Sequence, residues 1–132
     1  MPVPEELAPT APRILVISQD GNQIAALKRQ LEAIAPQVQL EATGNAVEGL
    51  MKVGLGCPDA LVLDAFIPGV DTREVCRQLR AAPETSQLAL VVVSEQASEA
   101  KAGFTEVGVH SVLQRPFDAA TLLATLPAVA QA

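Results

Sequence analysis

Three long apolar runs, separated by segments with helical spacing, constrain the fold of this chain more than any other feature. The runs are RILVIS at 13–18, DALVLD at 59–64 and LALVVVS at 88–94. Continuous apolar runs of this length suit strands buried on both faces, because a half-exposed strand alternates polar and apolar residues. Each run ends in a polar residue, where the predicted strand leaves the core.

Weaker patterns complete an alternation of strands and helices. Short strands are predicted at 38–42 and 109–113. Helices are predicted at 46–55, 72–82 and 97–107, between Asp20 and Pro36, and after Asp118, with Asp20 and Asp118 as capping residues. Five strands alternating with five helices predict an α/β fold, a doubly wound five-stranded parallel sheet with helices on both faces.

The predicted helices are amphipathic, and their apolar faces indicate the core. The residues expected to share these faces are Ile24, Leu27, Leu31 and Ile34; Val47, Leu50, Met51 and Leu55; Val75, Cys76 and Leu79; and Leu122, Leu123 and Leu126. Arg73, Arg77 and Arg80 are expected on a solvated helix face. The core should be aliphatic, because only 2% of the residues are aromatic.

Length and charge exclude several classes of protein. The 132 residues suit one domain, predicted at 13–127, between a disordered Pro-rich arm at 1–12 and a tail at 128–132. The net charge is −6 and the nine Lys and Arg are scattered, so direct binding to nucleic acid is not expected. No apolar run approaches a membrane span and no signal peptide is visible, so the expected location is the cytoplasm.

Polar residues at the ends of the predicted strands are the candidate site. Ser18, Gln19 and Asp20 follow the first strand, and Asp64 and Ser94 end the third and fourth. Arg115 follows the fifth. Since the carboxyl ends of parallel strands meet at one edge of a sheet, these groups are expected to converge there.

Three segments of the chain resemble the response-regulator receiver domain. PDALVLDAFIPGVDTREVCRQLR resembles the run around the phosphorylated aspartate of that family, VGVHSVLQRPF resembles its ending, and RILVISQDG its opening. The resemblance extends from about residue 13 to about residue 127. It implies a flavodoxin-like (βα)5 fold with strand order 2-1-3-4-5 and a role in two-component or phosphorelay signalling.

The resemblance also implies roles for single residues. Asp64 matches the phosphoacceptor, and Ser94 matches the hydroxyl residue that contacts the phosphoryl group. Arg115 stands where the family has a lysine, and its bond to Pro116 matches a peptide that is usually cis. The backbone of Phe66 matches a Mg²⁺ ligand.

The chain departs from the family where the metal would bind. The two adjacent carboxylates that follow the first strand in receivers are replaced by Ser18 and Gln19. Mg²⁺ prefers charged oxygen ligands, so the expectation is no cofactor, or Mg²⁺ bound weakly through Asp64, Asp20 and the Phe66 carbonyl. Asp20 lies one residue late, and capping the first helix is its favoured role.

Other departures affect the residues that contact the phosphoacceptor or move when a receiver is activated. Arg115 keeps the positive charge of the usual lysine but has a forked shape, so a bidentate pair with Asp64 is a hypothesis. Val112 replaces the aromatic residue that usually moves on activation. His110, the only histidine, is expected at the surface.

Two functions remain open at this point. One is phosphorylation at Asp64 by a histidine kinase, as in an ordinary response regulator. The other is a pseudo-receiver, which binds a histidine kinase or other signalling protein through fixed surfaces, with a homodimer through the fourth helix, fifth strand and fifth helix as one form. An enzyme is not expected, because an aspartate-nucleophile phosphatase would need a carboxylate at Phe66, and no nucleotide-binding loop or nucleophile elbow is present.

Overall fold

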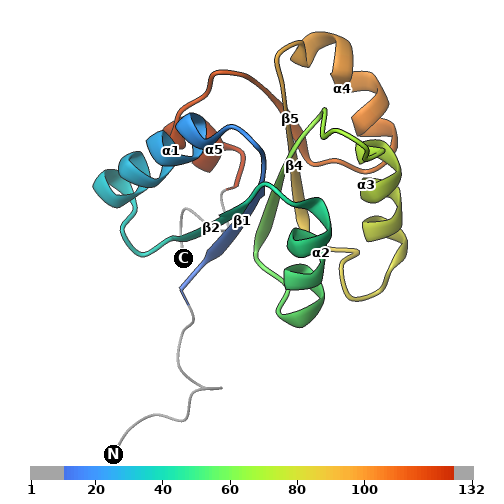
Figure 1. Ribbon diagram of the computed structural model, residues 1–132, viewed down its shortest axis with the longest axis horizontal. Coiled ribbons are helices and arrows are strands. Elements are labelled where there is room, and N and C mark those ends of the chain that lie inside the picture. The colour runs from blue at the N-terminus through green and yellow to red at the C-terminus, as the bar shows by residue number, and fades with distance from the viewer. Residues whose placement is uncertain (1–10, 127–132) are drawn as a thin grey trace, which may run out of the picture.

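Five parallel strands form the central sheet of the computed structural model, which describes residues 11–126 (Figure 1). They are β1 (Arg13–Ile17), β2 (Gln39–Thr43), β3 (Ala60–Asp64), β4 (Ala89–Ser94) and β5 (Ser111–Gln114). Their order is β2-β1-β3-β4-β5, and every neighbouring pair is parallel. The predicted sheet and its strand order are confirmed.

Helices cover both faces of this sheet (Figure 1). One face carries α1 (Gly21–Ile34) and α5 (Ala119–Ala124), and the other carries α2 (Ala46–Leu55), α3 (Thr72–Ala81) and α4 (Ala97–Glu106). Each face has its own aliphatic core. Leu27, Leu31 and Leu122 are buried on the first face, and Val53, Cys76 and Phe104 on the second.

Side-chain caps begin four of the five helices. Asp20, Asn45, Asp71 and Asp118 each accept the backbone N–H of the third residue along the chain. At Asp118 the N–H of Thr121 lowers the pKa of the carboxyl group below its usual value. Because Asp20 lies three residues after β1, the first turn of α1 starts at the carboxyl edge of the sheet, where the candidate site lies.

The prediction of which side of α2 packs on the sheet is wrong. Val47, Met51 and Leu55 are 68%, 63% and 87% exposed, whereas Gly49 and Val53 are buried against the sheet. The physical reason is the close approach of α2 to β1, since a Cβ at Gly49 would lie 2.6 Å from a side-chain carbon of Ile17. The glycine side of the helix therefore faces the sheet.

Two further expectations about side chains are corrected. Ile34 is 54% exposed and does not join the core under α1. Arg80 is not a solvated helix residue, because its guanidinium donates to the carbonyl oxygens of Gly108, Ser86 and Leu88 at 2.8, 3.1 and 2.5 Å. It joins the end of α3 to the segment before β4 and to the turn before β5.

The predicted ends of the domain are only partly described. Residues 1–10 of the predicted arm, and the predicted tail at 128–132, lie outside the described residues. Pro12 is buried and its carbonyl accepts the N–H of Gln39 at 2.8 Å, so this last residue of the predicted arm belongs to the packed domain. Within residues 11–126, no helix has the length and apolar character needed to cross a bilayer.

Candidate functional site

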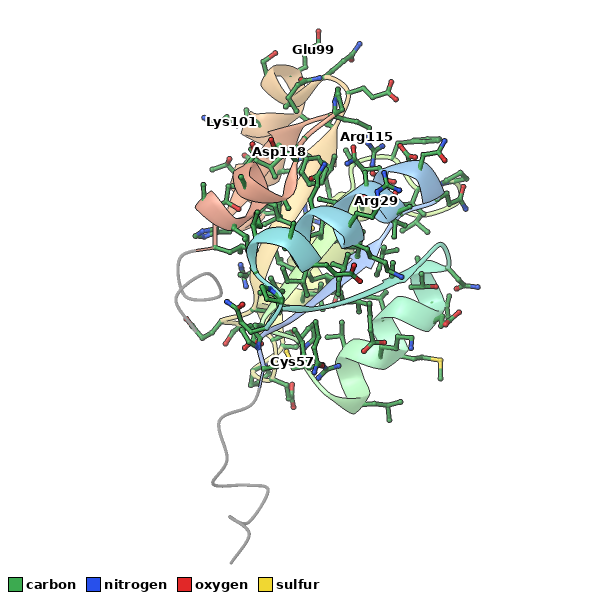
Figure 2. All side chains as sticks on the ribbon, turned by 90° about the vertical axis from the view of Figure 1, so that its left-hand side faces the viewer. Arg29, Cys57, Glu99, Lys101, Arg115 and Asp118 are labelled. Atoms are coloured by element: carbon green, nitrogen blue, oxygen red, sulfur yellow. The ribbon has the colours of Figure 1, made fainter. Side chains whose placement is uncertain are left out.

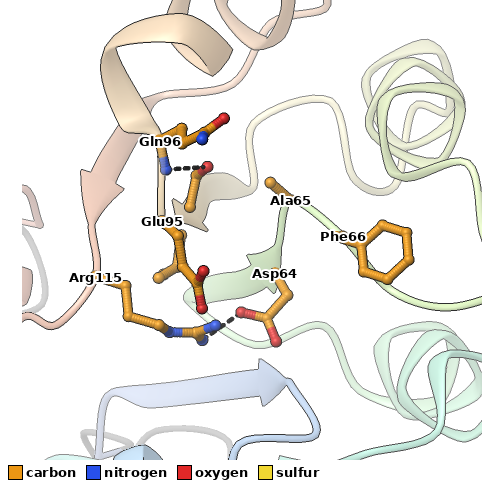
Figure 3. Close-up of a pocket in the computed structure, with 8 residues that line it drawn as sticks. Asp64, Ala65, Phe66, Glu95, Gln96 and Arg115 are labelled. Carbon is orange, nitrogen blue, oxygen red and sulfur yellow. Dashed lines mark hydrogen bonds and ion pairs between the residues drawn. The ribbon is translucent and has the colours of Figure 1, made fainter.

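The polar residues that end β3 and β4 and follow β5 line one pocket (Figure 3). Asp64, Ser94 and Arg115 contribute to it, together with Ala65, Phe66, Val93, Glu95 and Gln96, and its volume is about 370 Å³. The convergence predicted from the parallel topology therefore holds for the carboxylate, the hydroxyl and the guanidinium. The pocket opens at the carboxyl edge of the sheet, where ligands of open α/β sheets bind.

An ion pair crosses this pocket. Nη2 of Arg115 donates to Oδ1 of Asp64 (Figure 3). The side chains are 18% and 10% exposed, so the pair is largely removed from water. The contact uses one nitrogen and one oxygen, so the bidentate form of the hypothesis is not the one observed. In the described part of the chain, Nε of Arg115 is buried without a hydrogen-bond partner.

Ser18 belongs to the site, and Gln19 does not. The Ser18 side chain is buried, and its Oγ accepts the N–H of Asp20 at 3.1 Å and an N–H of Arg115 at 3.5 Å. Gln19 is exposed and does not line the pocket. A neutral hydroxyl therefore contacts the guanidinium at the first of the two positions where receivers carry carboxylates.

Asp20 has two contacts. Its Oδ1 accepts the N–H of Gln23 at 3.0 Å, which is the predicted capping role. Its Oδ2 lies 3.8 Å from Nε of Arg115, in an ion pair at the margin of the site. Arg115 therefore has the Asp64 carboxylate at one end of its guanidinium and the Asp20 carboxylate near its Nε.

Ser94 begins a loop that is held in place by hydrogen bonds from the side chain of Gln114. Its Oγ accepts the N–H of Gln96 at 3.0 Å. The amide group of Gln114 accepts the N–H of Ala97 at 3.0 Å and donates to the carbonyl oxygen of Glu95 at 2.6 Å. Gln114 is not among the predicted site residues, and its position beside Arg115 at the end of the last strand is the only signal that the sequence offers for it.

Thr72 is a second residue that the sequence did not indicate. It is buried, and its Oγ1 donates to the backbone carbonyl of Asp64 at 3.4 Å. This bond joins the first turn of α3 to the end of β3 and helps to fix the main chain at Asp64.

The remaining predicted residues lie around the pocket or away from it. Phe66 is 79% exposed, and its ring points away from Arg115 (Figure 3). Val112 is half-buried against the core that lies under α3 and α4. The peptide bond between Arg115 and Pro116 is cis, the form that the resemblance implied. His110 is exposed, and its Nε2 lies 2.9 Å from the carbonyl oxygen of Thr125.

The groups at this edge do not fit a Mg²⁺ ion. Mg²⁺ requires octahedral oxygen ligands and usually one or two free carboxylates. Here the Asp64 carboxylate is bonded to a guanidinium, the Asp20 carboxylate caps α1, and Ser18 is neutral. Within residues 11–126, no group of three or more His, Cys, Asp or Glu side chains has the arrangement of a metal site.

Comparison with known proteins identifies the family. The model of the response regulator receiver domain matches residues 14–127. This chain belongs to the response regulator receiver family. Curated relatives include Response regulator MprA of Mycobacterium avium (strain 104) and of Mycobacterium tuberculosis (strain ATCC 25618 / H37Rv). Each is 36% identical over 117 residues, which cover 89% of this chain and 50% of the relative.

Solved receiver structures share the fold. The receiver domain of a DNA binding response regulator from Colwellia psychrerythraea 34H superposes with a TM-score of 0.81 at 18% identity, covering 92% of this chain and 99% of that one. The chemotaxis response regulator CheY4 of Vibrio cholerae gives 0.77 at 21% identity, covering 91% and 99%. This receiver domain spans about half the length of the curated relatives it matches.

Proposed function

We propose that this receiver domain acts in two-component signalling as a pseudo-receiver, which binds signalling proteins through fixed surfaces and is phosphorylated poorly at Asp64. The observation that carries the proposal is the ion pair between Asp64 and Arg115. A phosphoacceptor carboxylate must be free to attack phosphorus. A guanidinium bonded to its oxygen neutralises the negative charge on which that attack depends.

Ser18 supports the same proposal. In this family the metal at the site neutralises the charge that develops on the transferred phosphoryl group. The hydroxyl of Ser18 lacks the negative charge that would hold such an ion, and it contacts Arg115 instead. The guanidinium of Arg115 therefore supplies the positive charge next to Asp64 that a bound metal ion supplies in the family.

An ordinary phosphoacceptor is the second candidate. It is favoured by the position of Asp64 at the end of β3 and by the hydroxyl of Ser94 in the same pocket of about 370 Å³. For this function Arg115 would have to release Asp64 and turn toward the phosphoryl oxygens. The two candidates therefore differ in whether the ion pair opens under phosphorylating conditions.

The proposed partners are proteins. A histidine kinase or another signalling protein would dock on the domain, and a homodimer through α4, β5 and α5 is a further proposed form. The role is regulatory, with no substrate turned over. Any DNA binding would belong to a segment beyond this domain, because its nine Lys and Arg are outnumbered by 15 Asp and Glu.

The test is the response of backbone amide spectra to beryllofluoride, a phosphoryl mimic, with Mg²⁺. We expect no change around Asp64 and Ser94 in the natural chain. The positive control is the variant S18D/Q19D/R115K, which restores the acidic pair and the lysine and should respond. A beryllofluoride response in the natural chain, at the same concentrations as in this control, would favour the ordinary phosphoacceptor and refute the proposal.

A further inference from the structure

Helices α2 and α3 lie on the face of the sheet opposite α1 and α5 (Figure 1). Residues of both helices line a groove of about 980 Å³. Leu50 and Leu55 line it from α2, and Val75 and Leu79 from α3. Cys57, which follows α2, also lines the groove. In Figure 2 this residue lies near the lower end of the domain and Arg115 in its upper half, and the groove shares no lining residue with the Asp64 pocket.

The outer surface of α2 continues the apolar lining of this groove. Val47, Met51 and Leu55 are spaced four residues apart, which places them on one stripe of the helix, and each is more than 60% exposed. The opposite side of α2 already packs on the sheet through Gly49 and Val53. A helix that is apolar on both sides is typical of one that is covered on both sides.

The charged residues around the groove indicate what covers it. Asp71, Glu74 and Glu84 line it, and of the described residues that line it none is Lys or Arg. Arg77 pairs with Glu74 but does not line the groove, and Lys52 of α2 pairs with Glu41 of β2 at 3.1 Å. The groove therefore presents an apolar floor with a net negative rim.

This charge pattern discriminates among occupants. A second copy placed groove to groove would bring like carboxylates together, which disfavours the contact. An anionic membrane surface would be repelled by the same rim. An occupant with apolar residues on one side and Lys or Arg beside them satisfies both the floor and the rim.

We propose that the groove between α2 and α3 binds a basic amphipathic helix of another protein. Its apolar residues would lie against Val47, Met51 and Leu55, and its cations beside Glu74 and Glu84. Three side chains four residues apart span about 12 Å, so a partner helix of about three turns suffices. The proposal does not depend on how Asp64 is used.

The probe is a labelled peptide of about 15 residues with leucines at every fourth position and flanking lysines, long enough to form a helix on binding. Its affinity for the chain is measured by fluorescence anisotropy, and its site by amide shifts. We expect V47S/L55S to weaken binding by about tenfold or more through lost apolar contact. We expect E74Q/E84Q to weaken binding several-fold. Added salt should also weaken binding, because it screens the attraction between the lysines of the peptide and the carboxylates of the rim.

The matched control is I34S, which removes a similarly exposed apolar residue from α1 on the other face and should leave the affinity unchanged. The proposal is overturned if the peptide does not bind, if I34S weakens binding as much as V47S/L55S, or if a peptide with glutamates in place of the lysines binds equally well. It is also overturned if sedimentation shows a dimer that V47S/L55S dissociates, or if anionic vesicles bind the stripe.

Discussion

Replacing Arg115 with methionine removes the guanidinium from Asp64 while keeping a long side chain. A hydrogen bond to a charged group contributes about 1.5–3 kcal/mol, and removing one partner of a fully buried ion pair costs about 3–5 kcal/mol. The Asp64 and Arg115 side chains are 10% and 18% exposed, so some water remains available to the orphaned carboxylate. We expect R115M to lower the free energy of unfolding by about 2–3 kcal/mol.

D64N is the second substitution of a double-mutant cycle with R115M. Asparagine keeps an oxygen that can accept from Arg115, and the guanidinium still lies near Asp20, so the expected cost is about 1 kcal/mol. In the R115M background the same substitution removes a buried, unpaired charge. D64N should therefore recover part of the stability that R115M loses, with a coupling energy of about 1–2 kcal/mol.

The assay is urea unfolding followed by circular dichroism, because the chain contains no Trp or Tyr for intrinsic fluorescence. The matched control is the exposed pair of Glu74 and Arg77, whose side chains are 43% and 58% exposed. Its cycle, E74Q with R77M, should give a coupling energy below about 0.5 kcal/mol. An Asp64–Arg115 coupling energy no larger than that of the control would refute the reasoning, because the pair would then behave as a solvated surface contact.

Three further predictions test the packing. G49A should lower the free energy of unfolding by about 1–2 kcal/mol, because its Cβ would crowd the core. G54A has open space around it and should be neutral or stabilising by up to about 1 kcal/mol. Chemical denaturation of the two variants compares these effects. Burial raises the pKa of the Cys76 thiol from 9.0 to about 11, so a thiol reagent should label only the exposed Cys57 in the native state, and stability should fall as pH rises above about 9. R80A should cost about 1–2 kcal/mol in urea unfolding, because several backbone carbonyls lose their donor.

The sign of the Cys76 effect follows from linkage. The folded state holds the thiol proton more tightly than the unfolded chain, so stability is complete below the unfolded pKa. It is lost as the pH rises through the interval between the unfolded and the folded pKa. A C76A variant should lose this pH dependence, although it should also be less stable at neutral pH because it leaves space in the core.

The sequence predicts the sheet well because its signals are local. The three apolar runs have the length and composition of strands buried on both faces. The capping oxygens of Asp20 and Asp118 mark helix starts that the structure confirms. The strand order is not encoded in such local patterns. It came from the family resemblance, since periodicity says nothing about which strands are neighbours.

The misassigned face of α2 shows where local patterns fail. Apolar residues lie on two sides of this helix, so periodicity alone does not say which side meets the sheet. Gly49 decides the matter, because the helix axis can approach β1 only where no side chain intervenes. The contact with the sheet is therefore made at a glycine, a residue that contributes nothing to an apolar periodicity.

The candidate site was predicted in part for a similar reason. Parallel topology brings strand ends together, so the convergence of Asp64, Ser94 and Arg115 followed from the fold. The direction of a long side chain does not follow from it, and Arg115 meets Asp64 through a single nitrogen rather than two. The loop fastened by Gln114 also escaped prediction, because its partners are backbone atoms that any sequence would supply.

The most direct measurement for the account as a whole is a titration of the natural chain with Mg²⁺ alone, followed by the amide signals of Asp64, Ala65 and Ser18. If the guanidinium of Arg115 holds the Asp64 carboxylate, these signals should show no saturable shift through the millimolar range, while R115K with the acidic pair restored should show one. Saturable shifts in the natural chain at the same concentrations would contradict the account, because the carboxylate would then be free to bind the metal.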